Sequence, residues 1–142
     1  MIHAVVVTHG RFGEEMVKIA QTIGGEAKGV DVVSLLLEDS PGTFEDKVRH
    51  VLGKEEDNLL ILADIPGGTP CNVAVSLLLE YDAHIVTGVN LAMILELMTS
   101  ISFVPTAGEM AERLIQAAKD TTRILDRSQL GMQKNYGAHD EL

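Results

Sequence analysis

Apolar and polar residues follow a repeating order along the first 125 residues: a short apolar run, a turn, and then apolar positions at helical spacing. The apolar runs are rich in Val, Ile and Leu and are bounded by turn-forming residues, which predicts buried strands. We expect these strands at Ile2–Thr8, Val30–Leu37, Leu59–Ala63 and His84–Thr87. A further apolar segment, Ile101–Val104, fits either a short edge strand or a connection.

Five helices are predicted between and after these runs, because apolar residues recur there three or four positions apart. Their starts carry polar caps or an early proline: Ser40 with Pro41, Thr69 as N-cap with Pro70 at the first helical position, Asn90, and Thr106 with Glu109 as a capping box. The faces expected to pack inward are Phe12, Met16, Ile19, Ala20 and Ile23; Phe44, Val48, Val51 and Leu52; Val73, Leu77 and Leu78; and Met110, Leu114, Ala117 and Ile124.

Strands that alternate with helices form a parallel sheet with right-handed crossovers and helices on both faces. The expected fold class is therefore α/β, a doubly wound and mainly parallel sheet of the flavodoxin-like kind. In the strand order 2-1-3-4, strands one and three would be neighbours, although the alternation alone does not prove that order. We expect one domain over 1–125, with its last helix running to Leu125, and a C-terminal arm over 126–142 that is weakly ordered or packed on a partner.

Composition and charge narrow the function classes. Hydrophobic residues make up 46% of the chain, aromatics only 4%, and Trp is absent, so the core is aliphatic, as parallel sheets prefer. The net charge of -10 argues against nucleic acid as a partner, because phosphate binding needs clustered Lys and Arg. The same charge is compatible with a basic protein as a partner. Cys71 is the single cysteine, which suits a reducing compartment. No basic leader and no apolar run near the roughly 18 residues of a membrane span occur, so we expect a cytoplasmic protein.

The residues with the most chemical interest stand at two strand ends. His9 follows the first apolar run, and Asp64 follows the third. The carboxyl ends of parallel strands share one edge of the sheet, and ligands gather there at a topological switch point. If strands one and three are neighbours, His9 and Asp64 face each other across that crevice.

These residue types suit a histidine that carries a phosphoryl group. A neutral imidazole is a nucleophile, and a carboxylate that accepts one ring N–H fixes the tautomer and stabilises the charged ring that forms. The phosphoryl group would need donors, which the backbone of Gly10 and Arg11 and the helix start at Thr69 can supply. The glycines Gly67 and Gly68 would let the backbone approach closely.

Each of these residues also has an ordinary structural explanation. Asp64 can cap its own turn, Gly67 and Gly68 can form a tight turn, Thr69 can merely start a helix, and Arg11 can be a solvated surface residue. The joint occurrence at two strand ends is what favours the functional interpretation. The remaining histidines have no partner at metal-ligand spacing and neither glycine-rich nucleotide motif occurs, so we expect no metal and no cofactor.

Three segments resemble the IIA component of the mannose-family phosphotransferase system (PTS). They are V-V-V-T-H-G-R-F-G (Val5–Gly13), L-A-D-I-P-G-G-T-P-C-N (Leu62–Asn72) and V-T-G-V-N-L-A-M-I-L-E (Val86–Glu96). They come in the order and spacing of that family, and the resemblance covers about residues 1–125. The pairing of T-H-G with D-x-x-G-G-[ST]-P is the specific part of the match.

The resemblance implies a phosphoryl carrier of sugar uptake. The phosphocarrier protein HPr would phosphorylate His9 at Nε2, and His9 would pass the group to a IIB component, which phosphorylates a sugar entering through the membrane components IIC and IID. Asp64 matches the residue that orients the histidine, and Thr69 matches a hydroxyl near the phosphate. Members of the family are typically homodimers that exchange an edge strand; Ile101–Val104 and the segment after the fifth helix are both candidates for it.

The chain departs from the family pattern in one segment. Ile65-Pro66 replaces a polar-aromatic pair found in some relatives, which is expected to reshape the contact surface and to leave the chemistry intact. No long Ala/Pro linker follows Leu125, so a free-standing IIA protein is expected.

Three other functions stay open at this point. One is the phosphoryl-donor subunit of a dihydroxyacetone kinase, in which the turn from Asp64 to Pro70 would be expected to differ. Another is a non-catalytic, anion-binding regulatory module of flavodoxin-like fold, in which His9 is never phosphorylated. A histidine phosphatase fits less well, because those enzymes require an Arg directly before the His-Gly pair, and this chain has Thr8 at that position.

Overall fold

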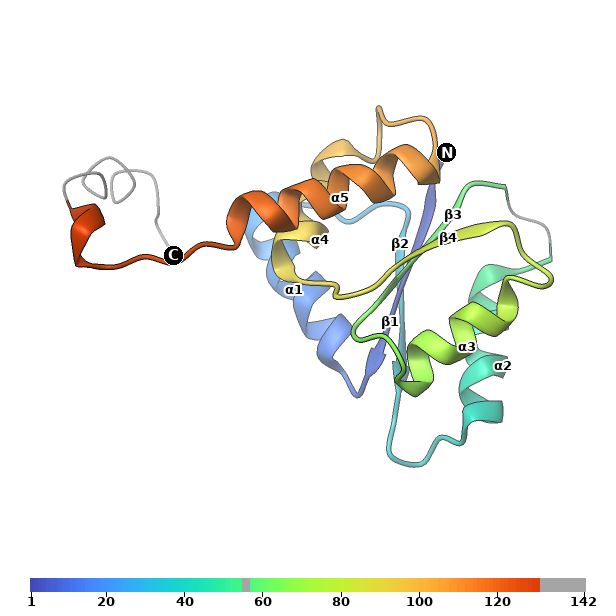
Figure 1. The fold of residues 1–142 in the computed structure, drawn as a ribbon. Coiled ribbons are helices and arrows are strands. Elements are labelled where there is room, and N and C mark those ends of the chain that lie inside the picture. Colours follow the sequence, from blue (N-terminus) through green and yellow to red (C-terminus); the bar gives the residue numbers. More distant parts are fainter. Residues whose placement is uncertain (55–56, 131–142) are drawn as a thin grey trace.

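The computed structural model describes residues 1–54 and 57–130, and its centre is a four-stranded parallel sheet in the order β2-β1-β3-β4 (Figure 1). The expected doubly wound α/β fold and its strand order are therefore confirmed. The strands are β1 (His3–His9), β2 (Val30–Leu35), β3 (Leu59–Ala63) and β4 (Ala83–Val86). Every pair in the sheet is parallel, so the carboxyl ends of all four strands lie along one edge.

Five α-helices cover the two faces of this sheet (Figure 1). Helices α1, α4 and α5 pack on one face, and α2 and α3 pack on the other. Alternate residues of β1 enter the two cores, with Ala4 and Val6 on the first side and Val5 and Val7 on the second. The helix bounds are α1 (Phe12–Gly24), α2 (Pro41–Leu52), α3 (Thr69–Leu77), α4 (Leu91–Ser100) and α5 (Ala107–Thr121).

The register of the sheet sets the position of the two strand-end residues. Strand β1 continues to His9, one residue beyond the expected end, and His9 pairs with Leu35 of β2. On its other side β1 pairs with β3, where Val7 lies opposite Ala63. Asp64 directly follows Ala63, so it lies just beyond the end of β3 and beside the last residues of β1. The central position of β1 therefore brings residues from both neighbouring loops around His9.

The inward face expected for the first helix is partly wrong. The residues of α1 that are buried are Gly13, Met16, Val17 and Ala20. Phe12, Ile19 and Ile23 are 52%, 48% and 40% exposed. The apolar side chains cover more of the α1 circumference than the sheet and α4 can bury, and the small residues Gly13 and Ala20 permit the close approach to the sheet.

Several expected element ends also need correction. Strand β2 stops at Leu35, two residues before the expected end, and β4 spans Ala83–Val86. The N-cap of α3 is Gly68, so Thr69 is the first helical residue instead of the cap. Leu78 lies beyond α3 and is 43% exposed.

The C-terminal third differs most from expectation. Residues 101–103 form turns and residue 104 has no regular structure, so this segment is not a strand. Helix α5 ends at Thr121, and Ile124, expected on its inner face, is 83% exposed. Its start shows half of the expected capping box, in which the Thr106 side chain accepts from the Glu109 N–H.

The chain beyond α5 leads away from the body formed by the sheet and its two helical layers (Figure 1). Within the arm expected over 126–142, the structure describes a short 3-10 helix, Arg127–Gln129. The remainder of that arm, 131–142, lies outside the described residues. None of the described helices is long and apolar enough to cross a membrane.

Candidate functional site

His9 and Asp64 meet at the carboxyl edge of the sheet. The Asp64 Oδ2 atom lies 2.7 Å from the His9 Nδ1 atom and also accepts the His9 backbone N–H at 2.8 Å. The second carboxylate oxygen, Oδ1, accepts the N–H of Ile65 at 2.9 Å. The His9 side chain is 48% exposed and that of Asp64 only 10%. The pair is therefore a shielded carboxylate that holds an open imidazole.

The environment of Asp64 keeps it ionised. Burial raises the pKa of this carboxyl, but the hydrogen bonds from the His9 backbone, the His9 ring and the Ile65 N–H outweigh burial and hold the pKa below its ordinary value. An ionised carboxylate can only accept hydrogen bonds, so the proton of the neutral ring sits on Nδ1. Nε2 then carries the free lone pair, and it makes no hydrogen bond within residues 1–54 and 57–130.

The lowered pKa of Asp64 predicts an acid-dependent contribution to stability. A carboxyl whose pKa is lower in the folded than in the unfolded state stabilises the fold above its unfolded pKa of about 3.9, and this contribution disappears as the pH falls through the folded pKa. The difference in free energy of unfolding between the wild type and Asp64→Asn should therefore be largest near neutral pH and should shrink below about pH 4. Urea unfolding at a series of pH values measures it. A difference that stays constant through the acid range would contradict the assignment.

Gly68 lies directly against the His9 ring. A Cβ atom built on Gly68 would fall 2.6 Å from Cε1 and 3.3 Å from Nε2 of His9. Any side chain at this position would push the imidazole away from Asp64. The absence of a side chain at Gly68 thus lets the start of α3 and the reactive edge of the ring come into contact.

The start of α3 offers unused donors beside that ring edge. Gly68 is the N-cap and provides no side-chain cap, and Pro70 has no N–H. In the described part of the chain, the N–H groups of Thr69 and Cys71 and the hydroxyl of Thr69 have no hydrogen-bond partner. Free N–H groups at a helix N-terminus attract anions. The site therefore combines a nucleophilic nitrogen with donors suited to a phosphoryl group.

We expect Gly68→Ala to uncouple His9 from Asp64 while leaving the fold intact. The backbone of Gly68, at φ -80 and ψ 163, suits alanine, so the added methyl group acts on the ring and not on the chain. Phosphoryl transfer to His9, the chemistry expected from the sequence, should slow about 10²-fold, as expected for an ångström-scale misplacement of a reacting group. Imidazole nitrogen shifts in NMR spectra would report the lost Nδ1 contact. Gly42→Ala, whose Cβ would meet only Ser40 Oγ at 3.7 Å, is the matched control and should behave as wild type.

The turn after His9 is fixed by its own hydrogen bonds. Gly10 adopts φ 54, and its N–H donates to the Leu35 carbonyl oxygen at 2.7 Å. Arg11 is the N-cap residue of α1, and its guanidinium donates to Glu14 at 3.0 Å. The structure therefore places Gly10 directly after His9 and Gly68 against the His9 ring, with Gly67 and Thr69 as the chain neighbours of Gly68, and it directs the Arg11 side chain toward Glu14.

Two residues that the sequence did not single out hold this geometry together. The hydroxyl of Thr8, fully buried, accepts the Gly13 N–H at 2.8 Å and donates to the Gly10 carbonyl oxygen at 3.3 Å. Asn72 donates from Nδ2 to the Gly67 carbonyl oxygen at 3.1 Å. A polar residue inside an apolar strand and an amide in the first turn of a helix were the available signals for these roles.

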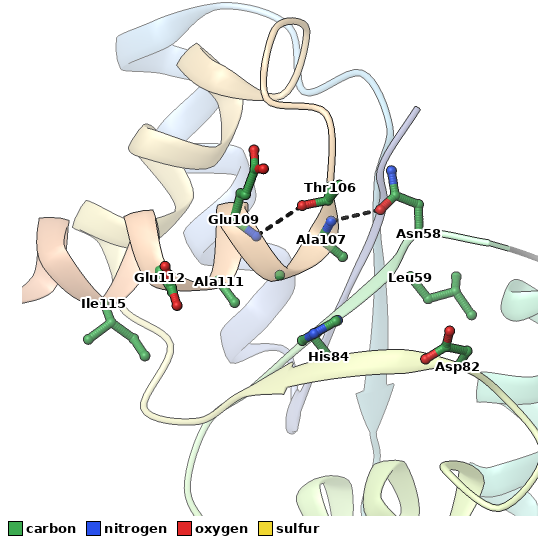
Figure 2. Close-up of a pocket in the computed structure, with 11 residues that line it drawn as sticks. Asn58, Leu59, Asp82, His84, Thr106, Ala107, Glu109, Ala111, Glu112 and Ile115 are labelled. Carbon is green, nitrogen blue, oxygen red and sulfur yellow. Dashed lines mark hydrogen bonds between the residues drawn. The ribbon is translucent and has the colours of Figure 1, made fainter.

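A pocket of about 570 Å³ lies away from this site, between β4 and α5 (Figure 2). Its lining includes Asp82, His84, Glu109 and Glu112, but none of the residues expected to bind phosphate. Across the part of the chain that the structure describes, no three His, Cys, Asp or Glu side chains gather in a way that could hold a metal ion. This pocket is therefore separate from the sheet edge that carries His9 and Asp64.

Comparison with known proteins finds relatives in sugar transport systems. The chain is 24% identical over 127 residues to the PTS system mannose-specific EIIAB component of Escherichia coli strain K12, matching 87% of this chain and 39% of that protein. It thus spans about two fifths of the length of that relative. It is 31% identical over 102 residues to the PTS system fructose-specific EIIA component of Bacillus subtilis strain 168, which covers 70% of each protein.

Solved structures and a family model agree with these relatives. The mannose/sorbose specific IIA subunit from Enterococcus faecalis superimposes with a TM-score of 0.78 at 32% identity, covering 88% of this chain and 95% of that one. A component EIIA from Streptococcus agalactiae shares the fold, with a TM-score of 0.81 at 24% identity over 91% of this chain and 99% of that one. The EIIA-man family model, described as PTS system fructose IIA component, matches residues 3–115. The chain belongs to this family of phosphotransferase-system IIA components.

Proposed function

We propose that the protein is a phosphoryl carrier of a sugar phosphotransferase system and that His9 carries the group. Phosphorylated HPr is the donor and a IIB component is the acceptor, which passes the group to a sugar entering through the membrane components IIC and IID. The Nε2 lone pair of His9 attacks phosphorus, and the bond from phosphorus to the donor nitrogen breaks. Asp64 stays ionised and balances the charge of the phosphorylated ring.

The contact between Asp64 Oδ2 and His9 Nδ1 is the observation that carries this proposal. At 2.7 Å it assigns the proton to Nδ1, so that Nε2 is the nucleophile. This nitrogen faces the side of the ring at which Gly68 has no side chain. A histidine that served only to cap the strand would not require a shielded carboxylate together with an open ring edge.

The phosphoryl oxygens would be received by the start of α3. The Thr69 hydroxyl and the N–H groups of Thr69 and Cys71 are the donors, and the positive end of the helix dipole adds to them. Gly67 and Gly68 let this backbone approach the ring, and the Gly10 turn borders it from the other side. A role for Arg11 requires its guanidinium to leave Glu14, so we assign Arg11 the smallest part in holding the phosphate.

The alternatives are less favoured by the relatives. Three of those named above are phosphotransferase components described as specific for mannose, fructose or mannose/sorbose, which supports a sugar system over a dihydroxyacetone kinase. In a regulatory module that only binds anions, the nucleophilic tautomer of His9 would have no role. We also infer that transfer to partners takes place on the cytoplasmic side of the membrane, because HPr and IIB act there.

We propose that the protein acts as a homodimer and that the segment after α5 is the exchanged strand. The other candidate, residues 101–104, contains turns and no strand. The segment that follows Thr121 exposes Ile124 by 83% and Leu125 by 62%, and the outer edge of β4 has no neighbouring strand within the described sheet. The pocket between β4 and α5 adjoins this edge (Figure 2). Light scattering on the purified protein measures the oligomeric mass directly.

The experiment that tests the carrier function is the intact mass of the protein after incubation with phosphoenolpyruvate, enzyme I and HPr. We expect one added phosphoryl group that is lost in acid and retained in base, as is typical of phosphohistidine. An unmodified protein under conditions where HPr itself is phosphorylated would contradict the proposal and favour the anion-binding module.

A further inference from the structure

Thr8 carries a buried hydroxyl inside an otherwise apolar strand, and we propose that Thr8 is a positioning residue for phosphoryl transfer to His9. Its hydroxyl holds the peptide between Gly10 and Arg11 in one orientation. In that orientation the Arg11 N–H, and not the Gly10 carbonyl oxygen, is presented to the phosphoryl group. The role of Thr8 rests on the proposed function, because it names a donor for the transferred group and the side chain that orients this donor.

The Thr8 hydroxyl uses both its donor and its acceptor capacity in the turn after His9. Thr8 is fully buried in β1, where it follows the apolar residues 4–7. Its Oγ1 atom accepts the Gly13 N–H at 2.8 Å and donates to the Gly10 carbonyl oxygen at 3.3 Å. Burial of a hydroxyl costs free energy unless the group is hydrogen-bonded, and a valine would fill nearly the same space. Packing alone therefore does not explain the threonine.

The hydrogen bond to Gly10 sets the direction of the next backbone N–H. Successive strand residues point to opposite faces, and Thr8 contacts Gly13 of α1, so the His9 side chain projects to the face away from α1. In a trans peptide the carbonyl oxygen and the following N–H point in opposite directions, and no cis peptide occurs among the described residues. Because the Gly10 carbonyl oxygen is held toward Thr8, the Arg11 N–H points to the side on which His9 projects.

This N–H is available, and Gly10 alone would not keep it in place. The Arg11 N–H has no hydrogen-bond partner in the portion of the chain that the structure describes. Gly10 adopts φ 54, and a Cβ built on it would meet no atom within 4 Å. Glycine accepts many backbone conformations, so the peptide could rotate and turn its carbonyl oxygen toward the phosphoryl group. A carbonyl oxygen repels phosphoryl oxygens, whereas an N–H stabilises their charge.

The glycine turn before α3 has a restraint of the same kind. Gly67 also has a positive φ, of 83, and its carbonyl oxygen accepts a hydrogen bond from Asn72 Nδ2 at 3.1 Å. Gly67 directly precedes Gly68, which lies against the His9 ring. In both turns beside the ring, a side chain thus binds the carbonyl oxygen of a glycine. An anion site needs such carbonyl oxygens to be engaged elsewhere, and this common feature supports the role of Thr8.

Two substitutions separate the hydroxyl of Thr8 from the shape of its side chain. Thr8→Val keeps the shape and removes the hydroxyl, whereas Thr8→Ser keeps the hydroxyl and removes a methyl group. With phosphorylated HPr, we expect Thr8→Val to lower kcat about tenfold, the size of one lost hydrogen bond to a charged group, and to change KM less than about twofold. Thr8→Ser should keep kcat within about twofold of the wild-type value, because the hydrogen bonds remain.

Thr106→Ala is the matched control for lost stability. The Thr106 side chain caps α5 by accepting the Glu109 N–H, as the Thr8 hydroxyl accepts an N–H of α1. Thr106 lies beside Asn58, at the amino end of β3 and therefore at the edge of the sheet opposite His9 (Figure 2). This variant should unfold at a lower Tm than the wild type and keep its kcat.

The backbone amide signal of Arg11 in NMR spectra is a readout that a purely structural role of Thr8 would not change. When the wild type is phosphorylated, we expect the Arg11 amide proton to shift downfield, because it then donates to a phosphoryl oxygen. The shift should be largely lost in phosphorylated Thr8→Val and retained in phosphorylated Thr8→Ser.

The outcomes separate the role of Thr8 from the carrier function. A wild type that phosphorylated HPr does not modify contradicts the proposed function and the role of Thr8 with it. If the wild type is phosphorylated and Thr8→Val keeps both its kcat and the Arg11 shift, the role of Thr8 is overturned and the carrier function stands. A loss of kcat in Thr8→Ser or Thr106→Ala as large as in Thr8→Val would also overturn it, since side-chain shape or stability would then be the cause.

Discussion

The His9→Ala protein is expected to accept no phosphoryl group from phosphorylated HPr while keeping the wild-type fold. The substitution removes the nucleophilic Nε2 atom, and no other imidazole in the described residues is held by a shielded carboxylate at the sheet edge. The fold should persist because the His9 ring is about half exposed and the backbone N–H of residue 9 can still donate to Asp64 at 2.8 Å. Intact mass before and after acid treatment measures acceptance, and circular dichroism checks the fold.

His50→Ala is the matched control for this substitution. His50 is an exposed residue of α2, outside the sheet edge that carries His9. It should accept the phosphoryl group as the wild type does. Near-normal phosphorylation of His9→Ala would place the group on another residue and refute the assignment of His9.

The Asp64→Ala protein should accept the phosphoryl group at least about 10²-fold more slowly, the contribution typical of a group that positions a proton. Three effects act together on His9. The ring loses the partner that keeps it in one orientation, the proton is no longer confined to Nδ1, and the phosphorylated ring loses its counter-charge. The backbone N–H groups of His9 and Ile65 also lose their shared acceptor. Rapid-quench measurement of a single turnover isolates this step from product release.

Asp82→Ala provides the comparison for Asp64→Ala. Asp82 is an exposed carboxylate before β4, beside the pocket of Figure 2 and away from His9. Its removal changes the net charge by the same amount, so any long-range effect of charge on HPr binding is matched. If the two variants transfer equally fast, Asp64 serves only to shape the turn after β3.

The reactive pair was predictable because it depends on rules that act along the chain. An apolar run that ends in a His, and another that ends in an Asp followed by two glycines, both point to the carboxyl ends of strands. The helix starts at Ser40, Asn90 and Thr106 were equally legible, because each side chain accepts the N–H three residues on.

The helix faces and helix ends were less predictable because neighbours decide them. The α1 sequence offers two overlapping apolar stripes, and only packing against the sheet and α4 selects Met16 over Phe12 and Ile19. In the same way, α5 stops at Thr121 where the body of the protein ends, although apolar residues continue to Leu125. Apolar residues can recur at helical spacing even where this chain does not bury them, because surfaces that contact other proteins are also apolar.

The linear order of residues is enough to predict the α/β class, the four strands, and the candidates His9, Asp64 and Thr69, because strand and helix periodicity and cap chemistry are local properties. Only the folded chain brings residues 55 positions apart to 2.7 Å and selects Nδ1 for the proton. It also moves the α3 cap to Gly68, directs Arg11 to Glu14, and leaves Phe12, Leu37 and Ile65 exposed. These features depend on strand order and on the space between packed elements, which arise from contacts between distant segments and have no periodic signature in the sequence.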